Sequence, residues 1–235
     1  MQNGLWVVAE QIPTAQSLAM SLLVPAGYAV ESPGQQGVAT MLGELLWRGA
    51  GERDAKAHCD ALDNLGVDRG AGVEMYHISL YAMMIGSKIS DALPLLVDAV
   101  RRPTLPSAAI EPCRDLAIQD LQSLEDEPQR KVFYVLHQRH FPEPFGRTEL
   151  GVRRDIEALS RQQVEDYWQT ACVPGNAVIG FAGKFDWDEL LALVEQQFGD
   201  WRGSVAEPAE CGVAPRGYLH QTVDSAQVHI GVAYD

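Results

Sequence analysis

The sequence has 235 residues, of which 46% are hydrophobic and 21% are charged, and its formal net charge is −14. An acidic surface repels phosphate and anionic lipid, so the charge disfavours nucleic acid and membranes as partners. The apolar content is sufficient for a folded core and excludes disorder along the whole chain.

The first part of the chain alternates short apolar runs with turn residues. Its predicted elements are strands over 5–9 and 18–25, helices over 37–47 and 55–65, and a strand over 73–84. The helix over 37–47 rests on apolar residues spaced three and four apart, and Gly66 is the expected C-cap of the next helix. Residues 73–84 alternate between apolar and polar side chains, which predicts one continuous strand.

The rest of the chain is richer in helix. Its predicted elements are helices over 90–100, 112–124, 132–139, 160–170 and 186–198, and strands over 177–181 and 228–233. Ser90 and Asp186 are the expected N-caps of two of these helices. This order of strands and helices predicts an α+β fold, in which helices cover one face of a mixed or antiparallel sheet.

The four cysteines are far apart and irregularly spaced, which does not fit a zinc ribbon or a disulfide scaffold (Cys59, Cys113, Cys172 and Cys211). We expect buried free thiols, with Cys59 packed in the core. The N-terminal residues carry no signal-peptide features, and no apolar run reaches the roughly 18 residues of a membrane span. If Met1 is the native start, the protein is expected to be cytoplasmic.

Several segments, in order, resemble the pitrilysin (insulinase) peptidases, including their mitochondrial-processing-peptidase-like members. The matching segments are NGLWVV from Asn3, GVATMLGELLWRG from Gly37, PFGRTELG from Pro144, YWQTACVPGNAVIGFAG from Tyr167 and the helix 190–201, which ends in FGDW. The resemblance lies in their common order and spacing and covers nearly the whole chain. It implies a family domain over 1–203, a linker over 204–217 and the truncated start of a second, similar domain over 218–235.

In that family the first of these helices carries H-x-x-E-H, where two histidines bind zinc and the glutamate acts as a general base on the zinc-bound water. The counterparts here are Thr40, Gly43 and Glu44, so all three groups differ. A later helix supplies a third ligand, and its counterpart is Asp120 or Gln119. Neither H-x-x-E-H nor H-E-x-x-H occurs anywhere in the sequence. The resemblance therefore implies no catalytic residue, no metal and no cofactor.

Other catalytic and metal sites have weaker support. Thr40, Glu44 and Asp120 offer oxygen ligands that suit calcium or magnesium better than zinc, but a solvated or Arg-paired Glu44 is the preferred interpretation. His137 and His140 are three residues apart and are interpreted as two surface histidines. The sequence contains no serine-hydrolase elbow and no phosphate-binding glycine loop.

Degenerate members of the resembled family pair with active ones. The resemblance therefore implies an inactive protein- or peptide-binding subunit, paired with a zinc-bearing homologue or with itself. The strand near 73–81 corresponds to an edge strand that active members present to extended peptides, so the candidate peptide-binding residues are Val73, Glu74, Met75 and Tyr76. An ordinary internal strand is the other interpretation. Two further functions stay open: an active zinc-dependent metalloendopeptidase with an atypical site, and a structural subunit of a larger complex.

Overall fold

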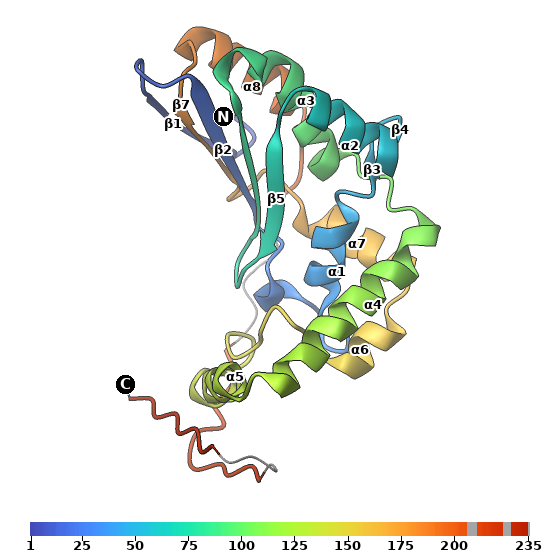
Figure 1. Cartoon of the computed structure of the whole chain (residues 1–235), viewed down its shortest axis with the longest axis vertical. Coiled ribbons are helices and arrows are strands. Elements are labelled where there is room, and N and C mark those ends of the chain that lie inside the picture. Colours follow the sequence, from blue (N-terminus) through green and yellow to red (C-terminus); the bar gives the residue numbers. More distant parts are fainter. Residues whose placement is uncertain (206–210, 223–226, 235) are drawn as a thin grey trace.

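The computed structural model describes residues 1–205, 211–222 and 227–234. The strands of its main sheet are β1 (Trp6–Gln11), β2 (Ser17–Val24), β5 (Asp68–Val73), β6 (Ile78–Ile85) and β7 (Val178–Gly183). They lie in the order β1-β7-β2-β6-β5, with β1 parallel to β7 and the other pairs antiparallel. A second, small sheet pairs β3 (Gly49–Ala50) with β4 (Arg53–Asp54). The helices pack on one side of the main sheet, which confirms the predicted α+β class (Figure 1).

The described part of the chain contains eight α-helices. They are α1 (Val38–Leu45), α2 (Ala55–Asn64), α3 (Ile89–Arg101), α4 (Ser107–Ser123), α5 (Pro128–His140), α6 (Arg153–Ala158), α7 (Arg161–Ala171) and α8 (Trp187–Phe198). None of them is long and apolar enough to cross a lipid bilayer. The sequence pattern did not indicate α6, because a six-residue helix is too short to show a helical period.

Two of the three expected helix caps are confirmed. The Asp186 carboxylate accepts the first free backbone N–H groups of α8. Gly66 follows α2 with a φ of +69°, the left-handed conformation of a C-terminal glycine. The cap expected at Ser90 is wrong, because α3 begins at Ile89 and its N-cap residue donates or accepts no side-chain hydrogen bond there.

The continuous strand predicted over 73–84 is also wrong, because the chain folds there as a β-hairpin. β5 ends at Val73, the connection follows, and β6 begins at Ile78. The backbone N–H of Glu74 donates to the carbonyl of His77 at 2.8 Å and closes the connection. β5 is the edge strand and β6 is internal. The pattern did not indicate β5, because glycines at two of its six positions remove the side chains that would mark a strand.

The core lies between the helices and one face of the sheet. Alternate residues of β2 point into it, namely Leu18, Met20, Leu22 and Val24. They meet the apolar faces of the helices, where the largest fully buried side chain is Phe198. Cys113 and Cys172 are buried as expected, but Cys59 and Cys211 are exposed. The core position expected for Cys59 is wrong, because its side of α2 faces solvent.

The described residues beyond 203 form neither helix nor strand. The strand predicted over 228–233 is therefore wrong: Val228 is 86% exposed and Ile230 is 83% exposed. An extended segment becomes a strand only where a neighbour pairs with its N–H and C=O groups. The boundary at 203 and the linker over 204–217 stay predictions, and residues 206–210, 223–226 and 235 lie outside the described residues.

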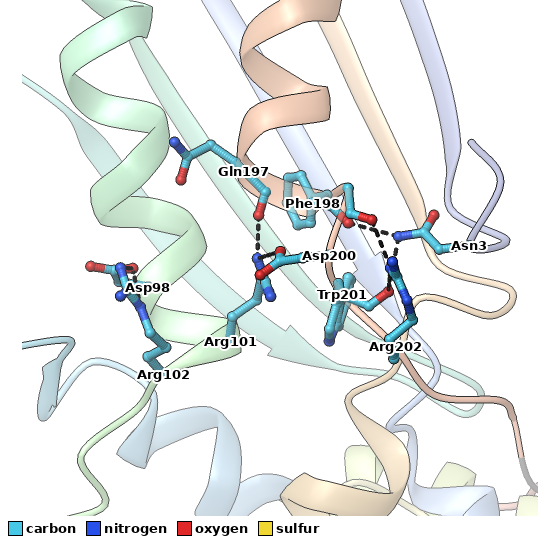
Figure 2. A network of polar contacts seen from close by, with 10 residues as sticks. Asn3, Asp98, Arg101, Arg102, Gln197, Phe198, Asp200, Trp201 and Arg202 are labelled. Carbon is cyan, nitrogen blue, oxygen red and sulfur yellow. Dashed lines mark hydrogen bonds and ion pairs between the residues drawn. The ribbon is translucent and has the colours of Figure 1, made fainter.

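A polar network joins the start of the chain to the ends of α3 and α8 (Figure 2). The Asn3 side-chain amide donates to the carbonyls of Phe198 at 2.7 Å and Trp201 at 3.2 Å. Beside it, the Arg101 guanidinium lies 2.9 Å from the Asp200 carboxylate. The Asn3 amide and the Arg101 guanidinium thus add side-chain donors at the C-terminal end of α8, where helix carbonyls lack intrahelical partners.

Replacing Asn3 with alanine is expected to lower the free energy of unfolding by about 1–2 kcal/mol, because the two hydrogen bonds from its side chain to partly buried carbonyls are lost. Urea denaturation followed by circular dichroism measures the change. Gln2→Ala is the matched control, since Gln2 is exposed. Equal stability of the two variants would show that the network adds nothing.

Candidate functional site

The helix α1 lies where the helical layer meets the free edge of the sheet. It packs against α4, α7 and the edge strand β5. The residue before it, Gly37, has a φ of +106°, a left-handed conformation that glycine adopts at little cost. This helix carries the three positions at which the resembled family has its zinc ligands and base.

The first turn of α1 is held by Glu31, which is only 4% exposed. Its Oε1 accepts the backbone N–H of Ala39 at 2.9 Å, and both carboxylate oxygens accept the N–H of Gly37 at 3.0 and 3.1 Å. Burial raises the pKa of the Glu31 carboxyl to about 7, although the two backbone donors and Arg147 act in the opposite direction. No sequence signal indicated Glu31, because it precedes the helix by more residues than any N-cap motif spans.

Thr40 is tied to a neighbouring loop. Its hydroxyl donates to the backbone carbonyl of Glu149. The Glu149 carboxylate accepts the hydroxyl of Tyr134 and lies 4.0 Å from the Arg130 guanidinium. The hydroxyl of Thr40 thus donates a hydrogen bond that joins α1 to the segment after α5.

Gly43 is buried against the edge strand. A Cβ atom at this position would lie 3.2 Å from Cγ2 of Val73, the last residue of β5. That distance is shorter than ordinary van der Waals contact. Val73 therefore leaves little room for a side chain at position 43, which corresponds to the general base of the resembled family. The helix accepts a glycine here despite a cost of roughly 1 kcal/mol relative to alanine.

Glu44 is partly exposed, and its carboxylate lies 3.6 Å from the guanidinium of Arg48, one turn further along α1. The preferred interpretation of an Arg-paired Glu44 is therefore confirmed. Cys113 of α4 lies beside this pair. Burial raises the pKa of the Cys113 thiol, and the nearby Arg48 partly opposes the shift.

The two candidates for a third ligand, Gln119 and Asp120, are both exposed on α4. The buried residues of that helix are Ile110, Cys113 and Ala117. In the described part of the chain, no group of three or more His, Cys, Asp or Glu side chains is placed to hold a metal ion. Zinc takes imidazole, thiolate or free carboxylate ligands in a tetrahedral arrangement. The three positions on α1 do not fit this requirement, because the Thr40 hydroxyl donates to a carbonyl, Gly43 has no side chain and Glu44 is paired with Arg48.

The four candidate peptide-binding residues divide between two structures. Val73 ends the edge strand, whereas Glu74, Met75 and Tyr76 lie in the hairpin connection. The carbonyls of Glu74 and Met75 already accept the backbone N–H groups of Tyr28 and Ala29, at 3.1 and 2.9 Å. These two carbonyls are therefore engaged within the protein.

β5 is an edge strand of the main sheet, and β1 is the other one. Within the described residues, no strand lies on the outer side of β5. The exposed ring of Tyr76 lies just beyond the end of this strand, with its centroid 6.2 Å from that of Phe145. Of the four candidate residues, only Val73 therefore belongs to the edge strand.

A groove of about 410 Å³ opens beside α5. Among its lining residues are Phe133, His137, His140 and Glu149. A ring nitrogen of His137 lies 2.9 Å from the carbonyl oxygen of Phe145. The two histidines interpreted as surface residues are thus half-buried in the wall of a groove.

The sequence is similar to those of known proteins. The sequence model of the insulinase family (peptidase family M16) matches residues 6–151, and that of the peptidase M16 inactive domain matches residues 158–235. The mitochondrial-processing peptidase subunit beta of Saccharomyces cerevisiae is 28% identical over 220 residues, which cover 93% of this chain and 47% of that protein. An uncharacterised zinc protease of Mycobacterium leprae is 27% identical over 200 residues, which cover 85% of this chain and 46% of that protein.

The fold is similar to that of solved structures. The crystal structure of a peptidase M16 inactive domain from Pseudomonas fluorescens superposes with a TM-score of 0.82 at 19% identity. The match covers 89% of this chain and 52% of that chain. The chain spans about half the length of the curated relatives that it matches.

Proposed function

Because the chain belongs to the insulinase (M16) family of peptidases, we propose that it is a catalytically inactive member that binds protein or peptide and pairs with a zinc-bearing homologue. The observation that supports inactivity is the composition of α1. Thr40 is bonded to a carbonyl, Gly43 has no side chain, and Glu44 is paired with Arg48. We accordingly propose no zinc site in this chain, only in its partner.

The glycine is the most consequential of the three changes. Gly43 has no group that could take a proton from water, and general-base catalysis is typically worth about 10²–10⁴ in rate. With Val73 against it, the space beside position 43 is also narrowed by the edge strand. The missing base at Gly43 and the close contact with Val73 both support a role in binding and not in catalysis.

Peptide binding does not depend on the altered positions. An extended polypeptide adds to a sheet edge through backbone hydrogen bonds, with side-chain contacts adding specificity. The outer side of β5 supplies such an edge among the described strands. One of the relatives is named as a subunit, which supports a pairing with a second polypeptide. A pairing of the chain with itself, and the expected cytoplasmic location, stay predictions.

The purified chain is expected to contain no stoichiometric zinc and to leave the oxidised B chain of insulin uncut. Mass spectrometry of the metal content and of the peptide products measures both, with 1,10-phenanthroline as the chelator control. The reason is that α1 offers no imidazole pair, has a glycine at the position of the base, and holds its one carboxylate, Glu44, against Arg48. One zinc per chain together with chelator-sensitive cleavage would establish the active alternative instead.

Binding requires its own measurement. The B chain is expected to bind reversibly, and a version N-methylated at alternate amides is expected to bind at least about tenfold more weakly, because methylation removes the donors that pair with β5. Mixing with a homologue that carries H-x-x-E-H is expected to raise that homologue's activity. A stable complex without any change in activity would favour a structural subunit, and no complex at all would refute the pairing.

A further inference from the structure

One segment, residues 27–37, which we call the strap, lies between the end of the edge strand β5 and the start of α1. Near its start, the backbone N–H groups of Tyr28 and Ala29 donate to two carbonyls of the β5–β6 connection, at 3.1 and 2.9 Å. A Cβ atom on Gly27 would lie 2.4 Å from three backbone atoms of the same connection. The strap therefore fixes the position of the connection into which β5 leads.

The other attachment of the strap is made by one buried side chain. Oε1 of Glu31 accepts the backbone N–H groups of Gly37 and Ala39, at 3.0 and 2.9 Å, which joins the strap to the first turn of α1. Glu31 is the only charged residue within the strap. The attachment to α1 thus depends on a group that can gain or lose a proton.

Three neighbouring elements present charged or titratable groups to Glu31. Arg147, after α5, donates to the backbone carbonyl of Glu31 at 2.6 Å, and its guanidinium pairs with the carboxylate of Glu143 at 2.5 Å. Asp155 of α6 accepts a backbone N–H of the strap at 3.1 Å and adds a second negative charge. Tyr167 of α7 donates its hydroxyl to a strap carbonyl at 2.9 Å. In the described part of the chain, an ionised Glu31 is therefore a buried charge without an ion pair of its own.

Protonation decides how well the Glu31 side chain tolerates this environment. Burial raises the pKa of the carboxyl from 4.5 to about 7. The neutral acid keeps one oxygen that accepts both N–H groups of α1, whereas the carboxylate is more stable in water. If the strap leaves α1 and Glu31 meets solvent, its pKa returns to about 4.5. The detached form is therefore favoured as pH rises between these two values.

The strap acts on β5 through the last residue of that strand. The N–H of Glu74 donates to the carbonyl of His77, so the even-numbered residues of β5 pair with β6. The odd-numbered residues, which end at Val73, direct their backbone groups to the free edge. Val73 directly precedes the connection that the strap holds. A detached strap would thus displace the end of the free edge.

We propose that Glu31 is a proton-controlled switch, which keeps the strap attached and the end of β5 ready for peptide pairing at acidic pH, and releases both above neutral pH. The inference rests on the proposed peptide binding at β5. Its size follows from the two pKa values of Glu31 in the attached and detached forms, 7 and 4.5. Between pH 6 and pH 8 the ratio of detached to attached strap rises about tenfold.

Native-state hydrogen exchange of the whole chain, resolved by NMR, tests the switch directly. Protection factors, which are corrected for the intrinsic exchange rates, are compared at pH 6 and pH 8. In the wild type those of the Tyr28 and Ala39 amides are expected to fall about tenfold. In Glu31→Gln, which keeps one acceptor oxygen and cannot ionise, they are expected to stay within about twofold. Glu52→Gln, at an exposed position, is the control and should behave as the wild type does.

The amides of β2 separate a local opening from global unfolding. They belong to an internal strand, so we expect them to exchange only when the whole chain unfolds. The strap amides are expected to be less protected than these at both pH values. Equal protection would mean that the strap does not open by itself.

Binding of the insulin B chain measures the consequence at β5. The wild type is expected to bind it at least about threefold more weakly at pH 8 than at pH 6, and Glu31→Gln to bind it equally at both. His77 and the titratable groups of the B chain are the same in both measurements. The difference between the two proteins therefore isolates Glu31.

Three results would overturn the switch. They are wild-type protection that does not change between pH 6 and pH 8, strap amides that exchange only by global unfolding, and a pH dependence of binding that Glu31→Gln retains. Should Glu31→Gln misfold, hydrogen exchange of the wild type decides alone. If the B chain binds at neither pH, the proposed function fails, while the exchange data still decide whether the switch exists.

Discussion

Replacing Gly27 with alanine is expected to lower the free energy of unfolding by about 3 kcal/mol, at the upper end of the usual cost of overpacking. A Cβ atom at this position would lie 2.4 Å from three backbone atoms, namely Glu74 O, Met75 O and His77 N. Backbone atoms cannot swing aside as the end of a side chain can. The β5–β6 connection as a whole would have to move.

The glycine is needed for space and not for its backbone conformation. Gly27 has a φ of −82°, which alanine adopts without strain. The residues after it, Tyr28 and Ala29, donate backbone hydrogen bonds into the same connection. A displaced connection would lose these bonds as well, which adds to the cost.

Urea denaturation of the wild type and of Gly27→Ala measures the effect. Gly180→Ala is the matched control, because it makes the same change at a sheet glycine with open space around it. Its stability is expected to stay within about 0.5 kcal/mol of the wild type or to rise slightly. If both variants were equally stable, the close approach at Gly27 would not be a constraint in solution. Under the proposed function, only Gly27→Ala should also weaken peptide binding, since β5 leads into the displaced connection.

The second large effect concerns pH. Replacing Glu31 with glutamine is expected to make the protein more stable than the wild type at neutral and higher pH, by up to about 3 kcal/mol. The variant keeps a carbonyl oxygen that can accept the N–H groups of Gly37 and Ala39, as Oε1 does now. It removes the buried negative charge that the carboxylate acquires when it ionises, and it replaces one of the two oxygens that share the Gly37 N–H with an amide nitrogen.

The sign follows from the direction of the pKa shift. Burial raises the pKa of Glu31 from 4.5 to about 7 in the folded protein. Between these two values the folded protein binds the proton and the unfolded chain does not, so the stability from this group falls as pH rises. It is fully present below about pH 4.5 and is lost above about pH 7.

The measurement compares unfolding free energies of the wild type and Glu31→Gln near pH 4.5 and near pH 8. The difference between the two proteins should be small at the lower pH and large at the higher pH. Glu52→Gln, at an exposed position, controls for the general loss of one negative charge. A difference that is the same at both pH values would mean that the Glu31 carboxyl is not held in a buried environment.

The sequence alone determined most of the helical layer and the composition of the candidate site. The helix over 37–47 follows from apolar residues three and four apart, and the structure places α1 within that range. The sequence itself gives the residues at the three motif positions, Thr40, Gly43 and Glu44. Such features can be read in a sequence because the interactions behind them act between residues a few positions apart.

Tertiary structure alone decided where binding surfaces form. Residues 73–84 turn back in a hairpin whose connection packs against Gly27, a residue far earlier in the chain. The carboxylate of Glu31 reaches the start of α1 only because the loop between them folds back. The main sheet is completed by β7, a strand from late in the chain that lies between β1 and β2. Contacts between distant segments leave no periodic trace in either segment, so only the folded chain reveals them.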